Sequence, residues 1–110
     1  MSDIQTIDRE DLKAKLDRGD DFDLIMIHTH TAFEAAHIPG SSNFHPHEHP
    51  MSDLPQDKAA DVVVYCTGPE CVASQMAYHA MVAEGYTNVR RYAGGLTDWD
   101  EAGYELVSGA

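Results

Sequence analysis

Residues 61–68 read DVVVYCTG, and this stretch decides the fold. Val62 to Tyr65 combines three β-branched residues with an aromatic one, which is typical of a strand buried on both faces. Residues 22–27 (FDLIMI) and 89–92 (VRRY) are two further short runs that predict strands. The Pro-rich residues 41–56 are expected to be mostly loop.

The spacing of apolar residues predicts helices between these strands. The expected spans are 8–19, 31–36, 71–84 and 96–102, with Gly19 and Gly85 ending the two longest. Asp8 is the expected N-cap of the first helix, and Tyr86 is expected to fold back onto Met81 in a Schellman motif. Strands that alternate with helices predict an α/β fold with a mostly parallel central sheet and helices on both faces.

Composition narrows the class of protein. The chain has 110 residues, 19 acidic and 7 basic side chains, and a formal net charge of -12. This length suits one domain, residues 1–110, with a core of its own, so two cysteines are not needed as a disulfide framework. The charge disfavours nucleic acid and anionic membrane surfaces as partners. Because no apolar run is long enough to span a membrane and no signal peptide is evident, we expect a cytoplasmic protein.

Cys66 is the expected catalytic residue because it directly follows the most apolar strand. In open α/β sheets, reactive groups collect at the carboxyl ends of the strands. Backbone N–H groups of the following loop and the positive end of the next helix would stabilise a thiolate or a persulfide anion there. The alternative is that Cys66 is a small buried apolar side chain.

Four segments resemble the rhodanese-like domain family, in the family's order and over nearly the whole chain. They are residues 32–40 (AFEAAHIPG), 62–66 (VVVYC), 85–89 (GYTNV) and 94–99 (GGLTDW). The resemblance implies a rhodanese fold and sulfane-sulfur transfer through a persulfide on Cys66, without a cofactor or metal. The residues expected to bind substrate around Cys66 are Thr67, Gly68, Pro69, Glu70, Cys71, Val72, Ala73 and His28.

The loop after Cys66 departs from the usual family pattern. Ser74 is the equivalent of the serine that opens the family's helix, so this loop is two residues longer and looks like the Cys-x-Gly-Pro-x-Cys variant. The loop contains no Arg or Lys, and Glu70 adds a negative charge. A doubly charged thiosulfate is better held by basic side chains, so we expect weak thiosulfate activity. The expected partners are a small persulfide or a persulfidated protein as sulfur donor, and a thiol as acceptor.

Cys71 has two readings of equal weight. It follows Cys66 by five residues, so closure of the loop would bring the two sulfurs together. In one reading it is a resolving thiol that attacks the Cys66 persulfide or forms a reversible disulfide. In the other it is a helix-face cysteine packed under the loop.

Two other functions remain open. At the end of the strand predicted at residues 22–27, Met26 and His28 replace the family's usual Asp-x-Arg pair, which favours a non-catalytic module that senses redox state or binds a protein. Metal binding is the other, through histidines of two segments. These histidines are His28, His30, His45, His47 and His49.

Overall fold

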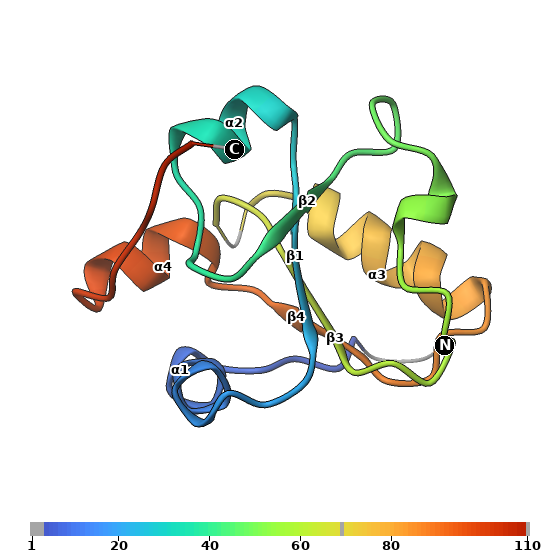
Figure 1. The fold of residues 1–110 in the computed structure, drawn as a ribbon, viewed down its shortest axis with the longest axis horizontal. Coiled ribbons are helices and arrows are strands. Elements are labelled where there is room, and N and C mark those ends of the chain that lie inside the picture. Colours follow the sequence, from blue (N-terminus) through green and yellow to red (C-terminus); the bar gives the residue numbers. More distant parts are fainter. Residues whose placement is uncertain (1–3, 69, 110) are drawn as a thin grey trace.

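A parallel sheet of four strands forms the centre of the molecule in the computed structural model, which describes residues 4–68 and 70–109. The strands are β1 (Asp23–Ile27), β2 (Ser42–Phe44), β3 (Val62–Tyr65) and β4 (Val89–Tyr92). They lie in the order β2-β1-β3-β4, which places β3 inside the sheet between β1 and β4 (Figure 1). The predicted α/β class and parallel sheet are confirmed.

Helices cover both faces of this sheet, as predicted. They are α1 (Arg9–Arg18), α2 (His30–Ala35), α3 (Ala73–Ala83) and α4 (Gly95–Glu101), and a 3-10 turn, η1, spans Met51–Asp53. Residues of α1, α2 and α4 pack with Val63 and Tyr65 in one core, and residues of α3 pack with Val62 and Val64 in the other. Because successive strand residues point to opposite faces, β3 supplies both cores.

The ends of α1 and α3 follow from the local sequence. The Asp8 carboxylate accepts a hydrogen bond from the Asp11 amide, and Gly19 ends α1 with a φ of 72°. At the end of α3, the amide of Gly85 donates to the Val82 carbonyl and that of Tyr86 to the Met81 carbonyl, which is the predicted Schellman motif.

The two larger differences from the sequence prediction are the strand β2 and the start of α3. β2 lies inside the segment predicted as loop, where its register with β1 (Ile25 opposite Ser42) supplies the pairing that its own polar sequence does not signal. α3 begins at Ala73 rather than Cys71, because Cys71 belongs to a turn in which its amide donates to the Gly68 carbonyl.

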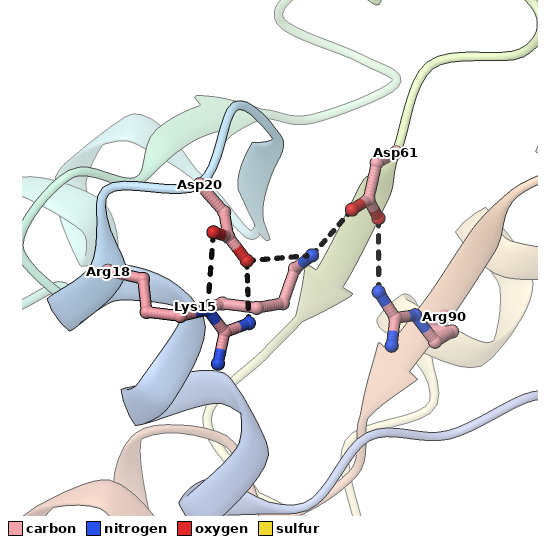
Figure 2. A network of polar contacts seen from close by, with 5 residues as sticks. All are labelled: Lys15, Arg18, Asp20, Asp61 and Arg90. Atoms are coloured by element: carbon pink, nitrogen blue, oxygen red, sulfur yellow. Dashed lines mark hydrogen bonds and ion pairs between the residues drawn. The ribbon is translucent and has the colours of Figure 1, made fainter.

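A network of charged side chains closes the amino end of the sheet (Figure 2). Asp61, directly before β3, accepts hydrogen bonds from Lys15 Nζ of α1 at 2.5 Å and from Arg90 Nη2 of β4 at 3.1 Å. Asp20 lies 3.9 Å from the same Lys15 nitrogen and 2.6 Å from Arg18 Nη2. The Lys15 side chain is only 11% exposed, so these contacts hold α1 against the edge of the sheet.

None of the described helices has the length and apolar character needed to cross a membrane.

Candidate functional site

Cys66 lies at the carboxyl end of β3, at the centre of the sheet. It is 1% exposed and follows the fully buried Tyr65. Because β3 is flanked by β1 and β4, the loop after Cys66 leaves the sheet between two neighbouring strand ends. This is the place where α/β folds position reactive groups.

The two cysteines of the chain are joined by a disulfide. Cys66 and Cys71 have Cα atoms 6.2 Å apart and a bond between their Sγ atoms. The expected thiolate is therefore absent from this state, in which Cys66 is oxidised and closed off from solvent. The two sulfurs lie together, as the reading of Cys71 as a resolving thiol requires. Cys71 lies in the loop before α3 and not on the helix face where the other reading put it.

The first part of the loop is fastened to the start of α4. The Cys66 carbonyl accepts from the Leu96 amide at 3.1 Å, and the Thr67 carbonyl accepts from both the amide and the hydroxyl of Thr97 at 2.9 Å. Gly95 has a φ of 63°, and a Cβ atom there would lie 2.5 Å from the Cys66 carbonyl oxygen. A glycine is therefore required for the backbone of α4 to approach Cys66 this closely.

Arg91 of β4 holds the second part of the loop, and sequence reasoning missed it. Its Nε donates to Ser74 Oγ at 2.9 Å and its Nη2 donates to the Cys71 carbonyl at 3.3 Å. Arg91 is 6% exposed, and this burial lowers the pKa of its guanidinium. The loop contains no basic residue, but register with Val64 turns Arg91 toward α3 and thus toward the loop. A charged residue inside a short buried strand was the available signal.

The remaining residues predicted around Cys66 are spread along the loop. Thr67, Glu70 and Val72 are exposed, Gly68 and Ala73 are half-buried, and Pro69 lies outside the described residues. The described polar partner of Cys66 Sγ is Thr67 Oγ1 at 4.0 Å, and no described amide donates to this sulfur. The expected cradle of amides is therefore not formed around Cys66 in the disulfide state.

The described hydrogen bonds of His28 stabilise the turn after β1. Its Nδ1 accepts from the Thr29 amide at 2.8 Å, and its carbonyl accepts from Asn43 Nδ2 at 2.8 Å. None of these contacts reaches Cys66, so they do not place His28 against the sulfur.

The histidines between β2 and η1 form hydrogen bonds with one another's backbone. His45 Nδ1 accepts from the His47 amide at 3.1 Å, and His49 Nδ1 accepts from the His45 amide at 3.0 Å. His30 instead pairs with Glu34 at 3.0 Å. Across residues 4–68 and 70–109, no three side chains of metal-ligating type converge, so the geometry gives the metal hypothesis no support.

An apolar groove lies beside the loop, between α3 and the segment that carries η1. Met51, Leu54, Met76 and Met81 are among the residues that line it, and Ala73 at the start of α3 forms part of its wall. Cys66 does not line this groove. Cys71 does not line it either, and the mostly apolar lining also includes His45 and His47.

A family model described as rhodanese-like domain matches residues 8–102. The chain belongs to this family. A protein named sulfurtransferase from Allochromatium vinosum is 30% identical over 107 residues, which cover 96% of both chains. An HTH-type transcriptional regulator, Rv0324 of Mycobacterium tuberculosis, is 29% identical over 109 residues, which cover 94% of this chain and 45% of the regulator.

The rhodanese fold is also found among solved structures. Thiosulfate sulfurtransferase from Pseudomonas aeruginosa superimposes with a TM-score of 0.84 at 21% identity, over 97% of this chain and 21% of that one. At this identity the similarity establishes the rhodanese fold alone. Membership in the family, together with the Allochromatium relative, supports a function of the sulfurtransferase type at family level.

Proposed function

We propose that this rhodanese-like domain is a sulfurtransferase in which Cys66 carries sulfane sulfur as a persulfide. The observation that carries the proposal is the position of Cys66 at the carboxyl end of the central strand β3, in a loop anchored on both sides. In the reduced protein, the Cys66 thiolate attacks the sulfane sulfur of a donor. A bond forms between the two sulfurs, and the donor's leaving group departs with the electron pair.

The second half-reaction passes the sulfur on. The thiolate of an acceptor attacks the outer sulfur of the Cys66 persulfide, the sulfur–sulfur bond breaks, and Cys66 leaves as a thiolate. The protein returns to its starting state without a cofactor.

Charge around the loop bears on the class of donor. Glu70 is exposed in the loop, and the chain as a whole has a net charge of -12. The described donors of Arg91 are directed at Ser74 and Cys71, inside the loop. These features favour a small persulfide or a persulfidated protein over the thiosulfate dianion.

Intact mass tests the loading step. Reduced Cys71→Ser protein, freed of thiols, is mixed with benzenethiosulfonate, a singly charged sulfane donor whose leaving group is benzenesulfinate. We expect the mass of one added sulfur and release of one sulfinate per chain. The matched control carries both Cys66→Ser and Cys71→Ser and should gain nothing. A Cys71→Ser protein that stays unmodified would contradict the proposal.

Steady-state turnover tests the donor class. With cyanide as acceptor, we expect thiosulfate to be used weakly and with poor saturation. A KM for thiosulfate in the low micromolar range would contradict this part of the proposal.

One observation favours a second function, a redox-sensing module. The disulfide between Cys66 and Cys71 is a form that such a module would adopt under oxidation. The mass experiment separates the two functions, because the Cys71→Ser form of a module that only senses redox state would gain no sulfur from the donor.

A further inference from the structure

Cys66 and Cys71 differ in their surroundings although they share one bond. Cys66 is 1% exposed and fixed to the sheet, whereas Cys71 is half-buried and lies between the exposed residues Glu70 and Val72. A thiol arriving from solvent therefore meets Cys71 first. The disulfide therefore joins a buried sulfur, that of Cys66, to a more accessible one, that of Cys71.

We propose that Cys71 turns the persulfide of Cys66 into free sulfide, a proposal that rests on Cys66 accepting sulfur as described above. The Cys71 thiolate attacks Cys66 Sγ. The bond between Cys66 Sγ and the outer sulfur breaks, and the outer sulfur leaves with the electron pair as hydrosulfide. The new bond is the Cys66–Cys71 disulfide that the structure shows.

A dithiol resets the protein. Its first thiolate attacks Cys71 Sγ, which forms a mixed disulfide and releases the Cys66 thiolate. Its second thiol then displaces Cys71 and closes the disulfide of the dithiol. The net reaction reduces one sulfane sulfur to sulfide and oxidises one dithiol to its disulfide. The domain would therefore act as a dithiol-dependent sulfane-sulfur reductase in addition to its transfer activity.

The loop is built to favour the internal attack. Hydrogen bonds to Leu96 and Thr97 fix the Cys66 end, and those to Gly68 and Arg91 fix the Cys71 end. The Cα separation of 6.2 Å lies within the range that disulfides span. A nucleophile held at this distance acts at an effective concentration far above that of free cellular thiols. Internal attack should then outrun transfer to an external monothiol.

A single-turnover experiment separates this step from loading. Reduced wild-type protein and reduced Cys71→Ser protein are each mixed with one equivalent of benzenethiosulfonate, with no added thiol and without oxygen. Benzenesulfinate reports loading of Cys66, sulfide reports release, and intact mass identifies the final form of the protein. Cys71→Ala serves as a second variant, and circular dichroism checks the folding of both.

The expected result differs between the two proteins. The wild type should release one sulfinate and one sulfide per chain and finish as the disulfide, lighter by two hydrogens. Cys71→Ser and Cys71→Ala should release one sulfinate, retain the extra sulfur and produce no sulfide above the blank. A wild type that releases sulfinate but keeps the sulfur overturns the reductase proposal and leaves the transferase standing. If no protein releases sulfinate, the transferase proposal itself fails.

Discussion

The two ends of β3 are built from opposite kinds of chemistry. At the amino end, Asp61 is held by Lys15 and Arg90, in contacts that need no change of state to persist. At the carboxyl end, Cys66 and Cys71 are joined by a bond that any thiol can exchange. Cys66 lies five residues after Asp61, so the strand β3 connects a paired charge to a cysteine whose disulfide is reversible. The contacts at the amino end are fixed ion pairs, whereas the bond at the carboxyl end can open and close.

Two neighbouring arginines of β4 serve these two ends. Arg90 lies opposite Val63 and reaches Asp61, whereas Arg91 lies opposite Val64 and reaches Ser74 and the Cys71 carbonyl. Since successive strand residues point to opposite faces, one step along the chain moves a guanidinium from the charged network to the disulfide loop.

The largest loss of stability is expected when a side chain is added where α4 approaches Cys66. In Gly95→Ala, the new Cβ would lie 2.5 Å from the Cys66 carbonyl oxygen and 2.8 Å from the Gly68 nitrogen, both backbone atoms that are held in place. We expect a loss of more than about 3 kcal/mol in the free energy of unfolding. Loading of Cys66 should slow as well. Urea denaturation and sulfinate release measure the two effects.

Gly19→Ala is the matched control for this change. Gly19 has a φ of 72°, similar to that of Gly95, but a Cβ there meets nothing within 4 Å. Its cost should be the backbone term alone, about 1 to 2 kcal/mol. Equal losses in the two variants would show that the close approach of α4 to Cys66 does not matter.

The charged end should give the next largest effect. Asp61→Asn removes the carboxylate that pairs with Lys15 and Arg90 and leaves the mostly buried Lys15 cation with Asp20 at 3.9 Å. We expect a loss of about 2 kcal/mol in the free energy of unfolding, since a partly buried charge loses its main partner. Sulfur loading, measured on the folded protein, should be unchanged.

Asp17→Asn provides the comparison for an exposed pair. Asp17 lies 2.7 Å from Lys13 on the surface of α1. Its removal should cost less than about 0.5 kcal/mol. A slower loading reaction in Asp61→Asn would mean that the two ends of β3 are coupled rather than independent.

A smaller effect is expected at Tyr65, which precedes Cys66. Its hydroxyl accepts from the Ile38 amide at 3.1 Å and shares a hydrogen bond with Ser41 Oγ at 2.8 Å. Tyr65→Phe leaves the Ile38 amide without this acceptor and should cost about 1 kcal/mol at neutral pH. Urea denaturation of the two proteins measures the difference.

The pH dependence of that difference provides its test. Burial raises the pKa of Tyr65 from 10.0 to about 12. The neutral hydroxyl is therefore favoured in the folded state, so the stability tied to it is complete below pH 10.0 and is lost as the pH rises toward about 12. The gap between wild type and Tyr65→Phe should narrow over this window. A gap that stays constant or widens would contradict the assignment.

The smallest effect is expected on the rate of the proposed sulfide release, when Cys71 is held less firmly. Arg91→Lys keeps the charge but loses the fork that contacts both Ser74 and the Cys71 carbonyl. We expect sulfide release to slow by about threefold, or ~0.6 kcal/mol, while sulfinate release is unchanged. Single-turnover rates of the two products measure this split.

Arg90→Lys is the control, because Arg90 belongs to the network at Asp61. It should leave both rates as in the wild type. If the two lysine variants slow release equally, Arg91 has no particular part in holding Cys71.

The sequence predicted those features that local physics decides. The β-branched run Val62–Tyr65 formed β3 with the predicted bounds. Asp8 began α1 as its N-cap, and Gly19 and the Gly85–Tyr86 turn ended α1 and α3 as expected. Each of these signals acts within a few residues, so the rest of the fold is not needed to interpret it.

The features that sequence reasoning missed depend on partners outside the segment itself. β2 is a strand because β1 pairs with it, and Arg91 contacts the loop because its register with Val64 turns it toward α3. α3 starts late because Cys71 is tied to Cys66 and Gly68. The position of Cys66 was predictable from the chain, whereas the cation that holds its loop was not.

The interior position of β3 also determines how far a redox change can spread. Amide hydrogens of β3 bond to strands on both sides, so their exchange with solvent requires opening of the sheet itself. The described loop residues 67–68 and 70–72 have no such ladder, so we expect a thiol–disulfide cycle to alter exchange there while β3 stays protected. On this basis we expect the domain to alternate between oxidised and reduced forms without exposing either of its two cores to water.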